Sequence, residues 1–248
     1  MKIALIGYGK MGKAIEQVVI EEGKHEVVLK ITNDSKEKLT IENLQLADVA
    51  IDFTQPESAF TNVLLCFEAN VPIVVGTTSW AEGLEKAKQI CLQNNHTLFT
   101  SPNFSIGVNL FFHLNKYLAK LMTPFQEYQL KMSEIHHTEK KDAPSGTAIK
   151  LANDIIEDDN NHYKTWNLGK FIHPNQIPIE AIREAHVPGT HHVTYESEID
   201  FIQISHEAKG RKGFAVGALR AAEFIYGKAG YFTMEDLLFL TKSNHPSS

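Results

Sequence analysis

A run of fourteen residues, Glu134 to Thr147, contains side chains suited to protonating a substrate and binding its carboxylates. Histidine titrates near neutrality, which suits a general acid, and His136 and His137 are adjacent in this run. Lys140 adds a fixed positive charge for a carboxylate. Ser145, Gly146 and Thr147 begin a predicted helix, and their hydroxyls and free amides form an anion site. The combination fits a dianionic substrate better than a neutral one.

Two other interpretations of this run compete with a catalytic one. It could be a charged surface loop with a Pro-Ser helix cap. It could also be a metal site that uses His136, His137 and Glu139, joined by His191 or His192. Adjacent histidines rarely chelate one ion, and the sequence has no HxxxH or HExxH spacing, so we expect no metal. If the chain stays extended, the two histidines point to opposite sides, one toward the reacting carbon.

A glycine-rich turn lies near the N-terminus, between a predicted strand and a predicted helix. Its residues are Gly7, Tyr8, Gly9, Lys10, Met11 and Gly12, a GxGxxG pattern. The first glycine permits a tight turn, the second lets the backbone approach a pyrophosphate, and the third allows close helix–strand packing. Free amides at the helix start would bind the phosphates. Such a turn can also serve geometry alone, so the pattern by itself is weak evidence for a nicotinamide dinucleotide.

Asp34 strengthens the dinucleotide interpretation. It follows the predicted second strand, where a carboxylate can bind the hydroxyls of the adenosine ribose, although a helix or turn cap is the alternative. A carboxylate repels a 2′-phosphate, and only Lys36 or Lys38 could offset this because no arginine follows directly. The sequence therefore predicts NADH and/or NADPH as cofactor, with NADH preferred.

Two more segments follow predicted strands at the edge where open α/β sheets bind ligands. The first is Gly76, Thr77 and Thr78, and the second is Ser101, Pro102, Asn103 and Phe104. Their small and hydroxyl-bearing residues could approach the nicotinamide ribose and carboxamide. Taken alone, each segment is an ordinary turn.

The elements that position these residues indicate an α/β fold. Up to about Asn103 short apolar strands alternate with helices, which predicts a Rossmann-like, doubly wound parallel sheet. Strands are expected at 2–6, 26–31, 48–53, 72–75 and 97–100, and helices at 11–22, 56–69 and 80–94. Residues 104–211 are expected to form an inserted α+β domain with a mixed or antiparallel sheet. Residues 1–103 and 212–248 would form the dinucleotide-binding domain, and 104–211 the substrate-binding domain.

The inserted domain has less regular signals. Helices are expected at 108–122 and 147–157, strands at 128–135, 177–182, 193–197 and 199–205, and a solvated loop at 158–162. Two final helices, 215–226 and 234–240, return to the first domain. Arg183, His206, Lys209, Arg211 and Lys212 are expected to be exposed charges, although one or two of them could reach a carboxylate. His191-His192 is expected to cap a strand end.

Composition excludes several classes of protein. The net charge of −6 and the pI near 6.1 argue against a nucleic-acid partner. No apolar run approaches the length of a signal peptide core or a membrane span, so we expect no membrane partner and a cytoplasmic location. Cys66 and Cys91 lie in apolar helical patterns without zinc-ligand spacing, and we expect buried reduced thiols.

With these motifs in place, the chain resembles the dihydrodipicolinate reductase family, also named 4-hydroxy-tetrahydrodipicolinate reductase, of lysine and diaminopimelate biosynthesis. The resemblance runs in order through 7–12, Ile51-Asp52-Phe53-Thr54, 76–78, Asn103 to Asn109 and 136–147, and the last two are highly specific. It implies hydride transfer from a reduced nicotinamide to an unsaturated ring dicarboxylate, with loss of water. It also implies a homotetramer assembled through the sheet of the second domain, which closes over the first during turnover.

The resemblance assigns roles by motif position. His136 would be the general acid, and Lys140 would bind substrate and assist proton donation. His137, Ser145, Gly146 and Thr147 would lie at the substrate. The cofactor would contact residues 7–12, Asp34, 76–78 and 101–104.

Two alternative functions stay open from the residues alone. Another two-domain dehydrogenase of amino-acid precursors, such as aspartate or homoserine dehydrogenase, shares the glycine turn but leaves the His-His-x-x-Lys run unexplained. A non-catalytic redox sensor would bind dinucleotide without oxidising it, and no helix-turn-helix or basic patch supports that role.

Overall fold

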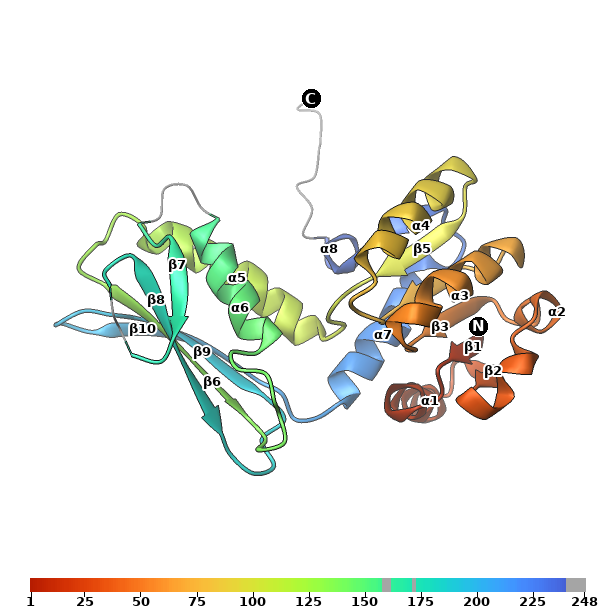
Figure 1. The fold of residues 1–248 in the computed structure, drawn as a ribbon, viewed down its shortest axis with the longest axis horizontal. Coiled ribbons are helices and arrows are strands. Elements are labelled where there is room, and N and C mark those ends of the chain that lie inside the picture. Colours follow the sequence, from red (N-terminus) through yellow and green to blue (C-terminus); the bar gives the residue numbers. More distant parts are fainter. Residues whose placement is uncertain (158–161, 171–172, 240–248) are drawn as a thin grey trace. The chain divides into compact units, whose positions relative to one another are not determined.

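The computed structural model describes residues 1–157, 162–170 and 173–239 and divides the chain into two compact units. Unit 1 contains Met1–Ile106 and the chain from Arg211 onward, and unit 2 contains Gly107–Gly210. Figure 1 shows their elements. Among the described residues, no helix is both long enough and apolar enough to cross a membrane.

Unit 1 is built around a parallel sheet of six strands in the order β11-β5-β4-β3-β1-β2. Its strands are β1 (Lys2–Ile6), β2 (Glu26–Ile31), β3 (Val49–Asp52), β4 (Ile73–Val75), β5 (Thr97–Thr100) and β11 (Gly230–Phe232). Its helices are α1 (Lys10–Glu22), η1 (Asn33–Lys38), α2 (Ile41–Leu44), α3 (Pro56–Glu68), α4 (Ala81–Gln93), α7 (Lys212–Ile225) and α8 (Met234–Leu237), and α5 (Ile106–Met122) leads into unit 2. The predicted doubly wound sheet is confirmed.

Alternation along β1 shows why both faces of this sheet are covered. Ile3 and Leu5 pack into a core with α1 and α7, whereas Ala4 and Ile6 pack into a second core with α3 and α4. Successive residues of a strand point to opposite faces, so an all-apolar strand requires helices on both sides. Cys66 and Cys91 are buried free thiols in the second core, as predicted.

Unit 2 contains a mixed sheet of five strands in the order β10-β9-β6-β8-β7. The strands are β6 (Gln129–His136), β7 (Thr165–Leu168), β8 (Gln176–Arg183), β9 (Thr190–Glu196) and β10 (Phe201–Glu207), and α6 (Gly146–Ile156) joins α5 in this unit. Strand β6 pairs with β8 in parallel and with β9 antiparallel. Helices α5 and α6 cover one face of the sheet, where Leu130 and Met132 enter a shared core (Figure 1). The predicted mixed sheet is confirmed.

Several elements differ from the sequence prediction, each for a local reason. Strands β7 and β11 were not predicted, because Thr165–Leu168 lacks alternating burial and the three-residue Gly230–Phe232 begins with glycine. The short helices η1 and α2 are also additional, and both start from threonine caps. Strand β9 begins at Thr190 rather than at 193, because pairing with β6 extends through two polar histidines. The predicted loop at 158–161 and the helix end at 240 lie outside the described residues.

Candidate active site

Strand β6 delivers two acid–base groups to the same face of the sheet. Its burial alternates, and Glu134 and His136 lie two residues apart with side chains 0% and 10% exposed. They point to the helix-covered side, as Leu130 and Met132 do. The neighbouring strands add two further polar groups, because His191 of β9 lies opposite Glu134 and Arg183 of β8 lies beside His136. The last residues of β6 and β8 and the first residues of β9 therefore form one polar cluster.

The carboxylate of Glu134 is the centre of this cluster. Its two oxygens accept hydrogen bonds from the Ser145 amide at 3.0 and 3.1 Å. Arg183 Nη2 donates to Oε1 at 3.3 Å, and His191 Nε2 and His136 Nδ1 lie 3.7 and 3.5 Å from Oε2. All these neighbours can donate, which matches an acceptor-only carboxylate.

Arg183 ties the loop after β6 to the sheet. Besides Glu134, its guanidinium donates to the Asp142 carbonyl at 2.6 Å and to the Lys140 carbonyl at 3.4 Å. Its side chain is only 21% exposed, so the prediction of an exposed charge was wrong. The rigid fork of donors explains why arginine can hold two carbonyls and a carboxylate at once.

Helix α6 begins at the edge of this cluster, at the residues where the sequence predicts an anion site. Ser145 is its N-cap, and its Oγ accepts from the Ala148 amide at 3.2 Å and lies 3.1 Å from His191 Nε2. Because the helical ladder starts with the Ile149 amide bonded to the Ser145 carbonyl, the Gly146 and Thr147 amides have no intrahelical acceptor. Among the described residues, no atom lies within 4 Å of the position that a Cβ on Gly146 would take. The helix start is open to an anion.

His136 has an environment that suits a proton carrier held in a fixed direction. Its ring lies 5.1 Å from the His191 ring at 74°, and the Cβ of a residue replacing Gly189 would lie 2.9 Å from its Nε2. Desolvation lowers the pKa of His136, an effect that Lys140 and Arg183 reinforce and that Glu134 and Asp142 oppose. Burial lowers the pKa of His191 to about 3, so this second ring is neutral near pH 7. His191 is therefore a buried member of the cluster rather than a strand-end cap, and that prediction was wrong.

Lys140 and His137 lie in the loop between β6 and α6. The Lys140 amide donates to the His137 carbonyl at 3.1 Å, and its Nζ contacts both carboxylate oxygens of Asp142 at 2.7 Å. This ion pair lowers the pKa of Asp142. His137 is half-buried. The structure thus brings His136, His137, Lys140 and the start of α6 into one region of unit 2.

The chemistry of the cluster disfavours a metal ion. Glu134, His136 and His191 have ligand atoms within 4.8 Å of one another, and this set shares only His136 and His191 with the metal site considered as an alternative from the sequence. Both oxygens of Glu134 are already used by the Ser145 amide, and one also accepts from Arg183. A cation there would have to displace the amide and lie beside a guanidinium.

In unit 1 the candidate cofactor residues lie at the carboxyl ends of adjacent strands. The segments 7–12, 76–78 and 101–104 follow β1, β4 and β5, and Asp52 ends β3. From β1 the chain proceeds to β2 on one side, while β3, β4 and β5 follow on the other. This is the topological switch point at which open α/β sheets bind ligands.

The geometry of the glycine turn fits a pyrophosphate. Gly7 has a φ of +85°, and a Cβ there would lie 2.3 Å from the Phe53 carbonyl oxygen, while a Cβ on Gly12 would lie 2.8 Å from the Gly7 carbonyl oxygen. In contrast, no described atom lies within 4 Å of a Cβ position on Gly9, which precedes α1 without a side-chain cap. The first and third glycines are required by packing, and the second leaves open space before free amides. The residues present fit a dinucleotide.

A buried carboxylate connects the loops that follow β3 and β4. Asp52 is fully buried, and its Oδ1 accepts from the Thr54 amide and hydroxyl at 2.8 and 2.7 Å and from Thr77 Oγ1 at 3.2 Å. Its Oδ2 accepts from Asn62 at 2.8 Å. Desolvation raises the pKa of Asp52, and these hydrogen bonds oppose that effect. The network holds Thr77 at the end of β3, the strand next to β1, which leads into the glycine turn.

The remaining predicted cofactor residues differ in how firmly they are held. Ser101 Oγ donates to the Asn103 carbonyl at 2.7 Å, and Phe104 packs 5.6 Å from Phe53. Thr78 and Pro102 are exposed. Asp34 is exposed in the first turn of η1, three residues beyond the end of β2, and its amide donates to the Thr32 cap. The Ile31 carbonyl at the end of β2 accepts from the Gly7 and Tyr8 amides, which ties that strand end to the glycine turn.

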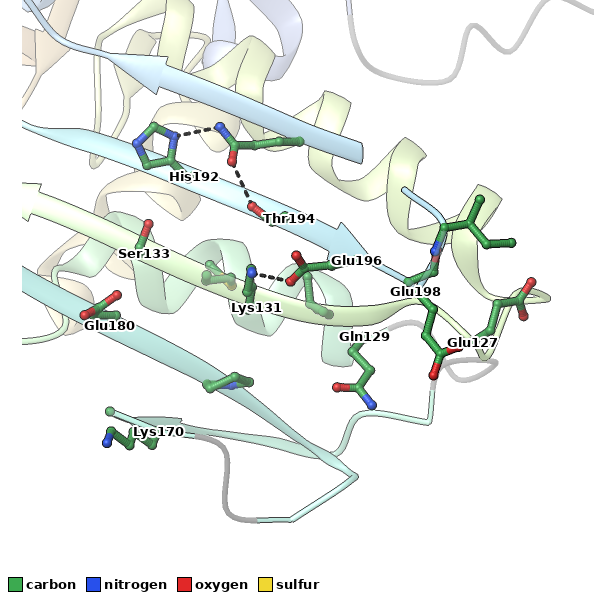
Figure 2. Close-up of a pocket in the computed structure, with 17 residues that line it drawn as sticks. Glu127, Gln129, Lys131, Ser133, Lys170, Glu180, His192, Thr194, Glu196 and Glu198 are labelled. Carbon is green, nitrogen blue, oxygen red and sulfur yellow. Dashed lines mark hydrogen bonds and ion pairs between the residues drawn. The ribbon is translucent and has the colours of Figure 1, made fainter. Parts of the chain in front are cut away.

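A separate groove of about 1070 Å³ lies on the face of the unit 2 sheet opposite its helices. Figure 2 shows polar residues of β6, β8 and β9 along it, including Lys131, Ser133, Glu180, His192 and Thr194. Lys131 is ion-paired with Glu196, and Thr194 Oγ1 donates to Gln203 at 3.1 Å. The acid–base cluster points to the other face, so this groove is distinct from it.

Four residues of these two sites were given no role in them from the sequence. Glu134 begins the run 134–147, but no role was assigned to it from the sequence. Its position two residues before His136 on an alternating strand indicates that both side chains lie on the same face. Asp52 lies in the motif Ile51-Asp52-Phe53-Thr54, which by itself indicated no role for this carboxylate. His191 and Arg183 carried no signal in the linear sequence, because only the pairing of β9 and β8 with β6 brings them to His136.

Comparison with known proteins finds the same family in both units, over nearly the whole chain. Residues 1–104 match the family model of dihydrodipicolinate reductase, N-terminus, and residues 107–238 match that of dihydrodipicolinate reductase, C-terminus. A curated relative from Christiangramia forsetii, 4-hydroxy-tetrahydrodipicolinate reductase, is 47% identical, with 96% of this chain and 98% of the relative covered. The protein of that name from Staphylococcus aureus is 37% identical, covering 96% and 100%.

A solved structure shares the fold. It is a dipicolinate-bound dihydrodipicolinate reductase from Paenisporosarcina sp. TG-14, similar with a TM-score of 0.76 and 23% sequence identity. The similarity covers 95% of this chain and 98% of that one. The two-unit architecture is therefore shared over nearly the full length of both chains.

Proposed function

This chain belongs to the dihydrodipicolinate reductase family, and we propose that unit 2 holds and protonates the substrate while unit 1 holds the nicotinamide cofactor. The activity is the NAD(P)H-dependent reduction of 4-hydroxy-tetrahydrodipicolinate in lysine and diaminopimelate biosynthesis. The observation that carries the division of roles is the convergence of His136, Lys140 and the open start of α6 within unit 2.

In the proposed mechanism the substrate's two carboxylates are held by different groups. One accepts from the Gly146 and Thr147 amides at the start of α6, where the helix dipole favours an anion. Lys140 pairs with negative charge on the substrate after exchanging its present partner, Asp142. His137 and Ser145 complete the surroundings of the substrate.

His136 supplies the proton that accompanies reduction. Its Nδ1 is enclosed against Glu134, so Nε2 is the nitrogen that faces substrate. When bound, the reduced nicotinamide supplies the hydride, and the proton from His136 balances it as the hydroxylated substrate loses water. Lys140 stabilises the negative charge and assists the proton transfer.

The cofactor is proposed to bind along the carboxyl edge of the unit 1 sheet. The open space at Gly9 and the amides that follow it receive the pyrophosphate, and residues 76–78 and 101–104 receive the nicotinamide ribose and carboxamide. The exposed carboxylate of Asp34 binds the adenosine ribose hydroxyls. Because this carboxylate repels a 2′-phosphate, we expect NADH to be preferred over NADPH.

The assembly and location are also proposals. A homotetramer is supported by the sheet face of unit 2 that α5 and α6 leave uncovered, where β10 exposes Phe201 at 64%. A cytoplasmic location agrees with a biosynthetic reductase of small molecules.

The decisive experiment is cofactor oxidation with substrate generated in place from pyruvate and aspartate semialdehyde by the preceding synthase. Loss of nicotinamide absorbance is followed separately for NADH and NADPH. Rapid oxidation that depends on the synthase, and that is faster with NADH, is the expected result.

The Asp34→Ala variant should weaken the binding of NADH far more than that of NADPH. Equal weakening of both cofactors would refute the role of Asp34, and no oxidation despite cofactor binding would refute the reductase.

A further inference from the structure

Glu134 stands out among the buried polar groups because its side chain contacts residues of β6, β8, β9 and the N-cap of α6. It is fully buried, and its carboxylate contacts Ser145 at the N-cap of α6, Arg183 at the end of β8 and His191 near the start of β9. His136 follows it by two residues on the same strand face. A buried carboxylate with this many partners costs desolvation, which a purely structural position could avoid with an apolar residue.

The bonds to Ser145 set the position of the anion site. Both carboxylate oxygens accept from the Ser145 amide, at 3.0 and 3.1 Å, and the next two amides are those of Gly146 and Thr147. The neutral His191 ring supports the same cap through Ser145 Oγ at 3.1 Å. The start of α6 is therefore fixed to β6 through one side chain.

The other contacts set the direction of the acid. His136 Nδ1 lies 3.5 Å from Glu134 Oε2, so a proton on Nδ1 faces the carboxylate and Nε2 is left for substrate. The charged and titratable groups around the ring are Glu134 on β6, Lys140 and Asp142 in the following loop, Arg183 on β8 and His191 on β9. Of the two carboxylates in this set, Glu134 is buried whereas the Asp142 side chain is 59% exposed.

We infer that Glu134 is a positioning residue for the reaction, whose carboxylate holds the anion-binding start of α6 and the His136 ring in fixed relation to each other. This inference rests on the proposed role of His136 as proton donor. The Glu134 side chain would have two separate effects on the reaction. Its bonds to Ser145 affect substrate binding, and its charge affects the proton on His136.

The test compares Glu134→Gln with the matched control Glu139→Gln, which removes an exposed carboxylate from the loop that follows β6. Glutamine keeps the size of the side chain but removes the charge beside Nδ1. The profile of kcat/KM against pH is measured with excess synthase, and the Kd for NADH by its fluorescence. Without the carboxylate the protonated form of His136 loses its stabilising neighbour, so the alkaline fall in kcat/KM moves to lower pH, by about 1–3 pH units.

In addition, kcat/KM near pH 7 is expected to fall about 100-fold in Glu134→Gln, because the acid and the anion site lose their alignment. The Kd for NADH should stay unchanged, since Glu134 belongs to unit 2. A pH profile that coincides with those of wild type and Glu139→Gln would overturn the inference, because a merely structural role moves stability and not the alkaline limb.

A second variant covers the case in which Glu134→Gln does not fold. Glu134→Asp keeps the charge but shortens the reach to Ser145, so the KM for substrate should rise while the alkaline limb stays near its wild-type position. An unchanged KM would contradict the positioning role. Failure of the proposed function is distinguishable from either result, because wild-type enzyme would then oxidise neither cofactor with substrate, and this inference would fall with it.

Discussion

His136 illustrates how substrate can create the acid that it needs. Burial lowers the pKa of this histidine in the free protein, so its neutral form is favoured at pH 7. A dianionic substrate beside the ring would favour the charged form, as any nearby negative charge does. If His136 is the acid, as we propose, substrate binding would be linked to proton uptake, and the protonated ring would be present for the reduction.

The role of His136 predicts a large and selective loss. His136→Gln should lower kcat by roughly 10²–10⁴-fold, the scale of general acid catalysis, and Lys140→Ala should do the same through lost charge stabilisation. Single-turnover and steady-state rates measure this, with the Kd for NADH as the control for folding. Near-normal turnover in both variants would contradict the assigned roles.

The Lys140–Asp142 ion pair leads to a prediction of opposite sign. Lys140 Nζ contacts both oxygens of Asp142, so a substrate carboxylate must compete with an internal one. The Asp142 side chain is 59% exposed, and an exposed pair is worth about 0.2–1 kcal/mol. Asp142→Asn should therefore lower the KM for substrate by up to about fivefold. An increase in KM would mean that Asp142 orients Lys140 instead.

At this scale the sequence identified groups through local spacing but not through pairing. His136, Lys140 and the Ser145 cap lie within one loop region, so their shared location followed from a short stretch of chain. Arg183 and His191 reach His136 only because β8 and β9 flank β6. Long-range pairing of polar strand ends has no signal in hydrophobic periodicity, which is why one was expected to be exposed and the other to be a cap.

At the scale of elements, the parallel sheet of unit 1 was predictable because its strands are short and mostly apolar. The strands β1, β3, β4 and β5 are apolar runs separated by helices, which permits few arrangements. The edge strand β11 was not predictable, since Gly230–Phe232 is only three residues long and is placed by long-range pairing with β5. The strand order of unit 2 was harder to predict. Strand β8 pairs in parallel with both β6 and β7, and hydrophobic periodicity does not show which strands become neighbours.

The loops at the carboxyl edge of unit 1 depend on one carboxylate, which can be tested. Asp52→Asn removes an acceptor oxygen from a network in which Oδ1 serves Thr54 twice and Thr77 once. Hydrogen bonds to a charged group are worth about 1.5–3 kcal/mol, so the Kd values for NADH and NADPH should both rise about 10–100-fold. Fluorescence titration measures this. A selective effect on one cofactor would place the change at the ribose end instead.

At the scale of the molecule, the two faces of the unit 2 sheet carry different sets of side chains, and we propose different roles for them. The helix-covered face carries Glu134, His136 and His191 at its strand ends, whereas the opposite face carries the polar groove (Figure 2). Alternation along a strand makes this division possible, because each residue belongs to one face only. In the proposed function, the outer face would take part in assembly without altering the side chains of the acid–base cluster.

This division predicts that assembly can be weakened from the outer face. Phe201 begins β10, is 64% exposed, and lies on an edge strand of the described sheet, where the outer strand edge and an apolar ring favour contact with another copy. Phe201→Glu would place a charge in that contact and should lower the mass measured by sedimentation from a tetramer toward smaller species. Leu92→Glu is the matched control, since Leu92 is 66% exposed on α4 of unit 1. If both variants sediment as wild type does, assembly does not use the β10 edge. If Phe201→Glu dissociates while its Kd for NADH is unchanged, the outer face of unit 2 is an assembly surface separate from the cofactor site.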